Sequence, residues 1–429
     1  MKYLILGTNL SGLLDAARLS LSDGAEVVLY DLEFPDPPQD LEAEVTVLPR
    51  EWRSEYLFGV DRVVTSPWFS ELVPPISDAL AVGIDVITEA AFGLEHIETP
   101  FIGITGTNGK TTVTEATTQM LVASGVNAVA AGNVGTAVSG LADTDLDILV
   151  LELSSYQLRF FGRSTPQAAG WLNMAPDHLD WHGTFEAYVD AKAKIFAEMA
   201  PDAVLVYNID DPVVVAAVET AGCRLLPCSA FRVPEGGSGV EDGRIVINGD
   251  EFEATTRDPS YLFNLAVAGT LARTAGATRE GVLTTIGAFT PGSHRRQVID
   301  TTDGILWIDD SKATNPHATE AAVHAYAPVI LLAGGRNKGL DLSTIGLLDG
   351  VTALVAFGES GAEIAEDSRS PSTVVRTLDE AVATARSIAR EGDTVLLAPG
   401  CASFDEFSSY AERGDVFQSL VTNTAEARL

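Results

Sequence analysis

The sequence contains few cysteines and no long apolar run. Its three cysteines are too few for a disulfide framework, and Cys223 and Cys228 lack the further ligands of a zinc site. We interpret all three as thiols of a reducing cytoplasm. No apolar run is long enough to span a bilayer, so we expect no integral membrane segment. The opening MKYLILGTNLSG is typical of a first strand and a glycine turn rather than of a cleaved signal.

Positive charge is also scarce. The chain has 27 Lys and Arg residues against 60 Asp and Glu, which gives a formal net charge of −33 at pH 7. This charge disfavours nucleic acid and anionic membranes as partners. A saline habitat would also explain the acidity, and the sequence leaves this open. The surface largely does without lysine, so each lysine is a candidate for a required point charge or amine. There are six: Lys2, Lys110, Lys192, Lys194, Lys312 and Lys338.

Short β-rich runs alternate with helical patterns along most of the 429 residues, which indicates an α/β fold with parallel sheets. A chain of this length exceeds one ordinary core. Three series of strands predict three domains, 1–94, 95–291 and 292–429. The polar insert 232–254 is expected to form hairpins. The predicted strands are 2–7, 25–31, 61–67, 83–87, 101–106, 146–155, 168–174, 203–208, 304–310, 328–335, 351–358 and 393–400.

The stretch GITGTNGKTT, residues 103–112, joins a predicted strand to a predicted helix and indicates a phosphate-binding loop. Gly106 and Gly109 let backbone amides turn toward an anion at the start of the helix. Lys110 can reach terminal phosphates, and Thr111 can ligate magnesium. Ile104 stands where the strict Walker pattern has glycine, so an ordinary turn before a helix is the alternative.

A second glycine-containing turn, GTNLSG at residues 7–12, follows the first predicted strand, and Asp31 closes the second. This pattern is similar to the dinucleotide fingerprint, but Asn9 replaces the glycine that lets the backbone approach a pyrophosphate. NAD is therefore disfavoured. A different nucleotide-like ligand and a purely structural turn both stay open.

Polar residues follow two strands of the middle series. Glu152 and Ser154 stand at the end of the run 146–155, where an acidic residue can hold magnesium. His178 lies in NMAPDHLDWHGT, after the run 168–174. Ligation and simple solvation are equally good local readings of His178.

The predicted helix 185–199 carries a lysine on its apolar face. Lys192 is three and four residues from apolar positions on either side, so we place it within the buried stripe. Lys194 is four residues from Asp190 and from Glu198, which is typical of a surface ion pair. An inward lysine that extends to water is the alternative to a functional one. The stripe comprises Tyr188, Val189, Ile195, Phe196 and Met199.

Three strand ends of the last series carry cationic or hydroxyl groups. Lys312 lies in IDDSKATNP, Lys338 in GGRNKG and Ser403 in CASFDEF. Together they predict a pocket for a small anionic molecule, whereas ordinary polar loop tips would show no such repeated placement.

These motifs, taken in order with LELSSYQL, DHLDWHG and AKAKIF, resemble the Mur ligase family along the whole chain. The pairing of DDSKATNP with CASFDEF resembles the glutamate-adding member. The resemblance implies a Rossmann-like UDP-binding domain, a central P-loop ATPase domain and a Rossmann-like amino-acid domain. It also implies a cytoplasmic monomer that uses ATP and two Mg²⁺ ions to add D-glutamate to UDP-N-acetylmuramoyl-L-alanine through an acyl phosphate.

The resemblance assigns a role to each site residue. Lys110, His178, Lys192 and Lys312 would be catalytic. Metals would bind Thr111 with Glu152, and His178 with a carbamylated Lys192. UDP would contact Leu10, Ser11, Gly12 and Asp31, and the muramoyl part would lie by Asn133 and Ser154. ATP would contact Gly106, Thr107, Asn108, Gly109, Lys110, Thr111, Thr112, Asn264, Arg295 and Asp310. Glutamate would contact Thr314, Lys338, Ser403, Phe404 and Tyr410. Arg296 departs from the family pattern, which has an apolar residue there.

Two other functions compete with this one. A folylpolyglutamate synthase shares the ATP loop and also adds glutamate, but it begins close to its ATPase domain and would not have residues 1–94. A catalytically inactive nucleotide-binding regulator would be expected to have lost Glu152, Lys192 or Lys338, and all three are present. The enantiomer of glutamate is not determined by these patterns.

Overall fold

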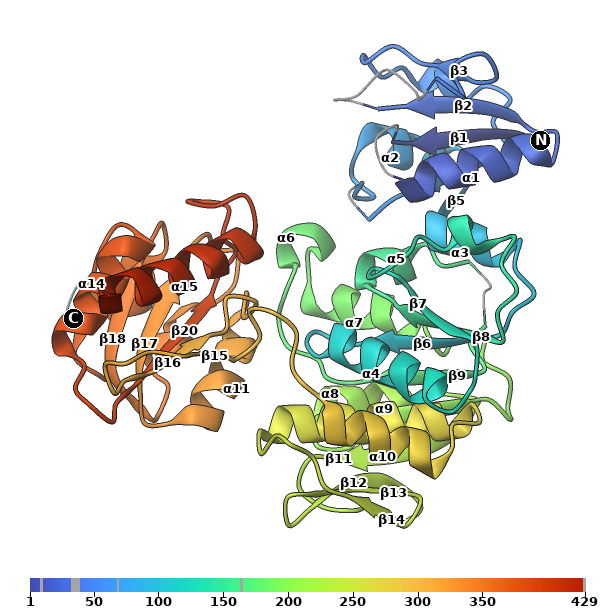
Figure 1. Cartoon of the computed structure of the whole chain (residues 1–429). Coiled ribbons are helices and arrows are strands. Elements are labelled where there is room, and N and C mark those ends of the chain that lie inside the picture. The colour runs from blue at the N-terminus through green and yellow to red at the C-terminus, as the bar shows by residue number, and fades with distance from the viewer. Residues whose placement is uncertain (8–10, 32–38, 68, 163–164, 427–429) are drawn as a thin grey trace. The chain divides into compact units, whose positions relative to one another are not determined.

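We describe the protein from a computed structural model, which describes residues 1–7, 11–31, 39–67, 69–162 and 165–426. Its strands form three sheets that consist mainly of parallel strands (Figure 1). This arrangement confirms the α/β class. The chain divides into two compact units, and we treat each by itself. The first comprises residues 1–174, 186–255 and 261–288, and the second comprises residues 175–185, 256–260 and 289–429. The domain boundaries near residues 94 and 291 stay predictions.

The first sheet has the strand order β3-β2-β1-β4-β5, and all neighbouring strands are parallel. From β1 the strand order continues on one side through β2 and on the other side through β4, so the order reverses at β1. Ligands of open parallel sheets bind at the carboxyl ends of the strands where the order reverses. Gly7, the first residue after β1, lies there. The strands are β1 (Lys2–Leu6), β2 (Glu26–Tyr30), β3 (Thr46–Val47), β4 (Arg62–Thr65) and β5 (Asp85–Thr88). The helices are α1 (Ser11–Ser22), the 3-10 helix η1 (Ser54–Leu57), α2 (Pro74–Ala81) and α3 (Glu89–Leu94).

The second sheet has the order β14-β13-β12-β11-β10-β9-β6-β8-β7. The antiparallel pairs β12–β13 and β13–β14 confirm the hairpins predicted for residues 232–254. Its strands are β6 (Phe101–Thr105), β7 (Ala128–Gly132), β8 (Ile148–Glu152), β9 (Ala168–Trp171), β10 (Val204–Asn208), β11 (Arg224–Ser229), β12 (Ser238–Glu241), β13 (Arg244–Ile247) and β14 (Asp250–Phe252). Its helices are α4 (Lys110–Val122), the 3-10 helix η2 (Ser139–Leu141), α5 (Ser155–Arg159), α7 (Phe185–Ala193), α8 (Pro212–Val218), α9 (Pro259–Thr274) and α10 (Arg279–Ala288).

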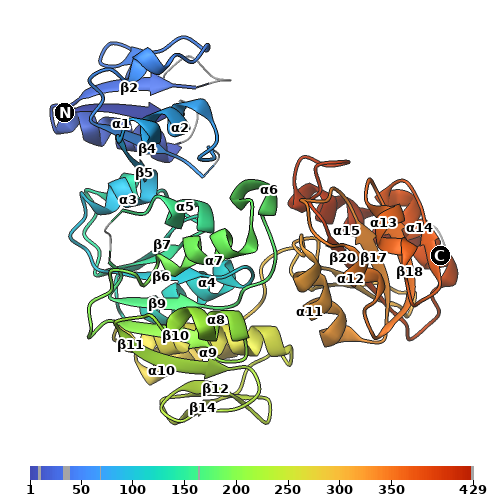
Figure 2. The ribbon, with the colours of Figure 1, turned by 180° about the vertical axis from the view of Figure 1, so that it is seen from behind.

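The third sheet has the order β15-β16-β20-β17-β18-β19, with β15 antiparallel to its neighbour. Successive residues of one strand face opposite sides, so Leu331 and Leu332 belong to two different apolar clusters. One cluster contains residues of α11 to α13 and the other residues of α14 and α15 (Figures 1 and 2). The strands are β15 (Gln297–Ile299), β16 (Leu306–Asp309), β17 (Val329–Gly334), β18 (Val351–Phe357), β19 (Ser372–Val374) and β20 (Thr394–Gly400). The helices of the unit are α6 (Leu179–His182), α11 (Pro316–Tyr326), α12 (Ser343–Gly346), α13 (Gly361–Glu366), α14 (Leu378–Ile388) and α15 (Tyr410–Glu426).

The helix predicted for residues 185–199 is shorter than expected, because α7 ends at Ala193. The following residues form turns closed by hydrogen bonds to the third residue back, such as Ile195 N to Lys192 O at 3.1 Å. The predicted apolar stripe is nevertheless largely buried. Tyr188, Ile195, Phe196 and Met199 are all at most 7% exposed.

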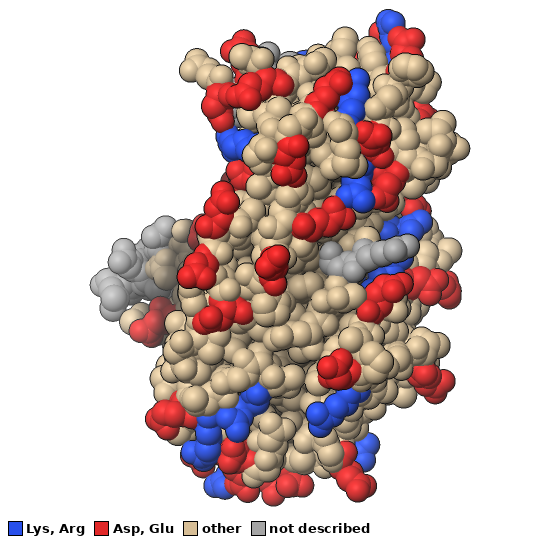
Figure 3. All heavy atoms as spheres, turned by 90° about the vertical axis from the view of Figure 1, so that its right-hand side faces the viewer, with Lys and Arg blue, Asp and Glu red and all other residues tan. Residues whose placement is uncertain are grey.

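On one face of the molecule the acidic side chains are dispersed (Figure 3). On the face drawn in Figure 3, acidic side chains are scattered from end to end, and many basic side chains lie beside them. Arg62, for example, pairs with Asp85 and Glu95. Among the helices of the described residues, none has the length and apolar character needed to cross a bilayer.

Candidate active site

The predicted phosphate loop joins β6 to α4. Gly106 (φ 153°) and Gly109 (φ 87°) both have positive φ angles, which glycine adopts without steric cost. Gly109 is the N-cap of α4 and has no side chain to accept from the first amides of the helix. The amides at the start of a helix are a common binding place for an anion, whose charge the helix dipole also favours.

Two asparagines that lie far away in the sequence hold this loop. Asn173 accepts from the amides of Thr107 (3.1 Å) and Asn108 (2.8 Å), and its own amide donates to Asn108 O at 3.1 Å. A side-chain carbon at Gly109 would lie 2.7 Å from Oδ1 of Asn264, so the Asn264 amide packs directly on the turn. The resemblance placed Asn264 by the nucleotide. Asn173 was not predicted, although its position just after β9 was a usable signal.

Lys110 folds back over the loop that precedes it. Its Nζ donates to the carbonyl oxygens of Gly106 (2.9 Å) and Thr107 (3.0 Å). Thr111 is half-buried beside it, and Thr112 is buried. The loop thus brings together an ammonium group, a hydroxyl group and the amides of a helix start, which is the set of groups that a triphosphate requires.

Glu152 is a buried carboxylate at the end of β8, the strand next to β6. Its Oε1 accepts from Asn133 Nδ2 at 2.8 Å, so Glu152 and Asn133 lie together. Its Oε2 is buried and has no hydrogen-bond partner among the described residues. An unsatisfied buried carboxylate oxygen costs free energy, and a cation would remove that cost.

The donor set around Glu152 fits magnesium. No group of three or more His, Cys, Asp or Glu side chains that could hold a metal is found among the described residues. Mg²⁺ is bound in nucleotide enzymes by one or two protein oxygens together with phosphates and water. One carboxylate beside a phosphate loop, with the Thr111 hydroxyl at the start of α4, meets that requirement.

Lys192 is almost completely buried, with 1% exposure, which confirms its predicted inward placement. Its Nζ donates to Gly106 O at 2.8 Å and lies 3.5 Å from Thr105 Oγ1, so Lys192 contacts the phosphate loop itself. Its Nζ also lies 4.7 Å from the centre of the Tyr188 ring. The Tyr188 hydroxyl in turn donates to Thr107 Oγ1 at 3.3 Å.

Lys194 points elsewhere, but the ion pair predicted for it is wrong. Its Nζ donates to the carbonyl oxygen of Arg159 at 2.7 Å instead of to Asp190 or Glu198. The helix ends before Lys194, which removes the helical spacing on which the prediction depended. Partial burial, and after it the charge of Arg159, lowers the pKa of Lys194.

Ser154 has a structural role in addition to any contact with substrate. It is the N-cap of α5, where its Oγ accepts from Gln157 N at 3.3 Å while Gln157 Oε1 accepts from Ser154 N at 3.0 Å. This reciprocal pair is a capping box.

In the second unit, Asp177 is a buried carboxylate with three partners. Lys338 Nζ donates to its Oδ1 at 2.6 Å and Asn315 Nδ2 to its Oδ2 at 2.9 Å. His178 donates its amide to Oδ1 at 2.9 Å and adopts a left-handed backbone, with φ 55°. Burial alone would raise the pKa of Asp177, but the charges of His178 and Lys338, together with the hydrogen bonds, lower it overall. Lys338 thus already has a carboxylate partner.

Hydrogen bonds tie the three predicted strand ends together. Gly400 N donates to Ala313 O at 2.9 Å, and Arg336 and Ala402 exchange two backbone hydrogen bonds. Lys312 Nζ lies 3.7 Å from the centre of the Tyr410 ring, a cation–π contact. Around these bonds, Ser403 is buried, Thr314 is half-buried and Phe404 is 58% exposed.

A buried arginine that sequence reasoning missed joins the same loops. Arg413 is 0% exposed and donates to Ser311 Oγ (3.0 Å), Ser311 O (2.9 Å) and Cys401 O (3.2 Å). Burial lowers its pKa to about 10. The Ser311 hydroxyl donates to Tyr410 O at 2.7 Å, so one network positions the loops that carry Lys312 and Ser403.

A second buried network surrounds Asp310. Arg296 donates its amide to Asp310 Oδ1 at 3.2 Å, and its guanidinium pairs with Asp258 and Asp310. The unusual Arg296 is therefore satisfied by two carboxylates. Burial raises the pKa of Asp310 to about 6, against the opposing charges of Arg296 and Arg295. The resemblance assigned both Arg295 and Asp310 to the nucleotide.

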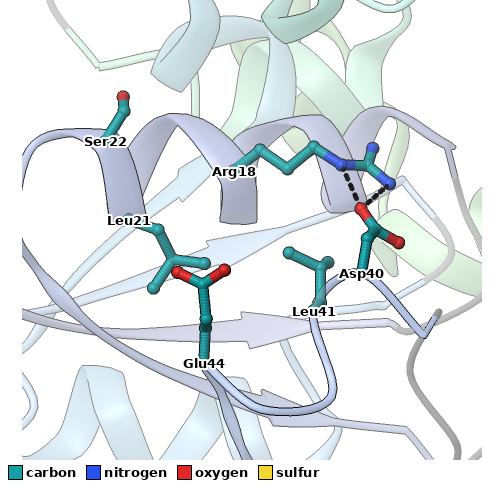
Figure 4. A pocket seen from close by; sticks show the side chains of 6 residues that line it. All are labelled: Arg18, Leu21, Ser22, Asp40, Leu41 and Glu44. Carbon is teal, nitrogen blue, oxygen red and sulfur yellow. Dashed lines mark hydrogen bonds and ion pairs between the residues drawn. The ribbon is translucent and has the colours of Figure 1, made fainter.

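The predicted UDP residues are only partly described. Leu10 lies outside the described residues. Ser11 opens α1, and its side chain is likewise outside them. Gly12 lies on α1, and Asp31 follows β2. A hollow of about 400 Å³ near α1 is lined by Arg18 and five neighbours, and in it the Arg18 guanidinium points to Asp40 (Figure 4). Of the predicted UDP residues that the structure describes in full, neither Gly12 nor Asp31 lines this hollow.

A strand, a glycine turn and a helix that begins at a lysine define the chain as an α/β protein with a P-loop nucleotide site. The Mur ligase middle domain matches residues 104–232, and the Mur ligase glutamate ligase domain matches residues 294–401. The chain belongs to the Mur ligase family, and the predicted resemblance is confirmed.

Relatives in this family match most of the chain. A protein of Shouchella clausii named UDP-N-acetylmuramoylalanine–D-glutamate ligase is 37% identical over 435 residues, which covers 98% of this chain and 96% of the relative. A protein of the same name from Thermobifida fusca is 39% identical over 394 residues, which covers 84% of this chain and 84% of the relative.

Solved structures show the same fold. A MurF ligase of Thermotoga maritima in complex with ADP has a TM-score of 0.64 at 18% identity, over 94% of this chain and 96% of its own. A bifunctional folylpolyglutamate synthase/dihydrofolate synthase of Yersinia pestis has a TM-score of 0.59 at 18% identity. The match covers 77% of this chain and 92% of that protein. At these identities the likeness concerns the fold alone.

Proposed function

We propose that the protein uses ATP to join D-glutamate to UDP-N-acetylmuramoyl-L-alanine in the synthesis of a peptidoglycan precursor. The observation that carries the proposal is the near full-length match, at 37% identity, to a ligase of that name. The phosphate loop, the neighbouring Glu152 carboxylate with one unpaired oxygen, and the joined strand ends of the second unit are consistent with it. The folylpolyglutamate alternative is less well supported, since the matching structure is 18% identical in sequence and covers only 77% of this chain.

The proposed reaction has two steps. The carboxylate of the muramoyl substrate attacks the γ-phosphorus of ATP, and the bond to ADP breaks to give an acyl phosphate. The amine of glutamate then attacks the acyl carbon, loses a proton and expels inorganic phosphate. Several anions meet at one point in both steps, so cationic groups must offset their repulsion.

The chain supplies groups for each of these tasks. The amides at the start of α4 and Lys110 would hold the phosphates of ATP, with Asn264 on the turn. Glu152 and Thr111 would hold Mg²⁺, which when bound neutralises phosphate charge. Glutamate would contact the joined strand ends through Thr314, Lys338, Ser403, Phe404 and Tyr410, with Lys312 beside Tyr410.

For a second metal we propose His178 and a carbamylated Lys192 as ligands, on the strength of the family resemblance. A carbamate forms when the neutral amine adds to carbon dioxide and a proton leaves. Burial disfavours the charged form of a lysine, and Lys192 is buried. The contacts of Lys192 with Gly106 O and the Tyr188 ring suit an ammonium group, so modification would exchange them for metal contacts.

Substrate choice provides the direct test of this function. Phosphate release is expected only with ATP, magnesium, UDP-N-acetylmuramoyl-L-alanine and D-glutamate together, because an acyl phosphate requires both the nucleotide and the muramoyl carboxylate. A panel of D- and L-amino acids and a folate acceptor would be measured in the same assay. Equal turnover of the folate, or no turnover of the muramoyl substrate, would reject the proposal.

Glu152→Gln is expected to raise the Mg²⁺ concentration for half-maximal activity. Loss of an outer contact of a metal site costs about 10- to 100-fold in affinity, so loss of a direct ligand should cost at least about tenfold. Glutamine keeps an oxygen that can accept from Asn133, which limits damage to the fold. Glu115→Gln, at an exposed position of α4, is the matched control. An unaltered magnesium titration for Glu152→Gln would remove this residue from the metal site.

A further inference from the structure

Helices α1 and α3 of the first sheet pack on the short helix η2 of the second sheet with little space between them. A side-chain carbon at Gly93 of α3 would lie 2.6 Å from Ser139 N, and one at Gly140 would lie 2.9 Å from Asp15 Oδ2 of α1. One at Gly12 would lie 2.7 Å from Ala137 Cβ. Glycine at these three positions is what permits the approach. We call this contact of α1 and α3 with η2 the η2 joint.

Glu89, the first residue of α3, joins α3 to η2 by hydrogen bonds. Its Oε1 accepts from Ser139 N at 2.7 Å, and the Ser139 hydroxyl donates to Glu89 O at 3.3 Å. The N-cap of η2 is Val138, whose side chain has no acceptor, so a carboxylate from α3 serves the first amide of η2. Burial raises the pKa of Glu89, although the hydrogen bonds from Ser139 oppose this effect.

The η2 joint is connected to the candidate site by a short, tightly bonded segment. Gly132 N donates to Thr136 O at 3.3 Å, and Asn133 N donates to Glu152 O at 2.9 Å. The Asn133 side chain contacts the Glu152 carboxylate, and η2 begins six residues further on. On the other side of the joint, α1 is the first helix after β1, and the nucleotide end of the substrate is expected at the carboxyl end of β1.

We propose that Glu89 is a positioning residue, which keeps the start of α1 in register with Asn133 and Glu152. This inference rests on the proposed function. A substrate held at its UDP end by the first sheet and at its acyl end by the second gains affinity only if both ends can engage at once. The same register brings the substrate carboxylate to the γ-phosphate, where small misplacements are costly in rate.

The test compares the whole substrate with its nucleotide end. Glu89→Ala is expected to lower kcat/KM for UDP-N-acetylmuramoyl-L-alanine by about tenfold or more, the effect of losing a charge-assisted hydrogen bond. UDP alone, measured by calorimetric titration, is expected to bind as it does to the wild type, because it needs only one side of the joint. Glu89→Gln can still accept from Ser139 N, so its kcat/KM for the muramoyl substrate is expected to lie between those of the wild type and Glu89→Ala. Glu95→Gln is the matched control, since Glu95 pairs with Arg62 at the surface.

Any of three other results would overturn the inference. Wild-type kcat/KM in both Glu89 variants of an active enzyme would show that the register does not depend on this carboxylate. An equal loss of affinity for UDP and for the whole substrate would show that Glu89 merely stabilises the first sheet. A wild-type protein that does not turn over the muramoyl substrate would reject the proposed function, and the inference with it.

Discussion

Replacing Lys192 with alanine is expected to remove nearly all ligase activity, whereas Lys194→Ala is expected to stay close to the wild type. Lys192 is buried and contacts the phosphate loop, while Lys194 donates to the Arg159 carbonyl oxygen outside that loop. An ordinary lysine of pKa about 10.4 is neutral in only about one molecule in 2,500 at pH 7, and only the neutral amine adds to carbon dioxide. A buried site and a nearby metal ion are the two conditions that would shift this balance toward the carbamate.

Three measurements separate the carbamate from a simple cation. Acetate or formate is expected to restore part of the activity of Lys192→Ala, because a small carboxylate can take the place of the carbamate. Lys192→Arg is expected to be inactive, since it keeps the charge but cannot be carbamylated. Electron density at Lys192 should show the added group. An active Lys192→Arg, together with no rescue by acetate, would mean that a cation on Gly106 O is what the site needs. Full activity of Lys192→Ala would reject both roles.

Lys338→Ala is expected to raise the KM for D-glutamate by about ten- to a hundredfold, with little change in the KM for ATP. The estimate corresponds to loss of one charge-assisted contact, worth about 1.5–3 kcal/mol. In the structure Lys338 donates to Asp177 at 2.6 Å, so the incoming carboxylate must share Lys338 with Asp177 or displace it. Arg336→Ala is the matched control on the same loop, because Arg336 pairs with Glu359 at the surface.

The pair with Asp177 allows binding and stability to be distinguished. Lys338→Ala leaves Asp177 buried with one cation fewer, which is expected to lower the melting temperature as well. In the double variant Lys338→Ala/Asp177→Asn, the melting temperature is expected to recover while the KM for D-glutamate stays high. If the KM for D-glutamate recovers together with the stability, or is unchanged in the single variant, Lys338 has no direct contact with the amino acid.

Strong local patterns were sufficient for much of the fold. Every strand predicted from an apolar run is present, and the hairpins at 232–254 are present too. The strands that were missed are β3, β7, β11, β15 and β19. Four of the five lie at the edges of their sheets, where a strand is covered on fewer sides and needs less of the apolar signal that prediction depends on.

The candidate site likewise has features that a local pattern predicts and features that depend on distant contacts. The sequence by itself determined the phosphate loop, the inward position of Lys192 and the three polar strand ends, because each depends on spacing within one short segment. Only the tertiary structure decided the pairing of Asp177 with Lys338, the clamp of Asn173 on the phosphate loop and the network of Arg413. The hydrogen bonds from Lys338 to Asp177, from Asn108 to Asn173 and from Arg413 to Ser311 join residues 161, 65 and 102 positions apart. Which distant polar groups meet depends on how strands are ordered and loops are closed, and no local pattern records that.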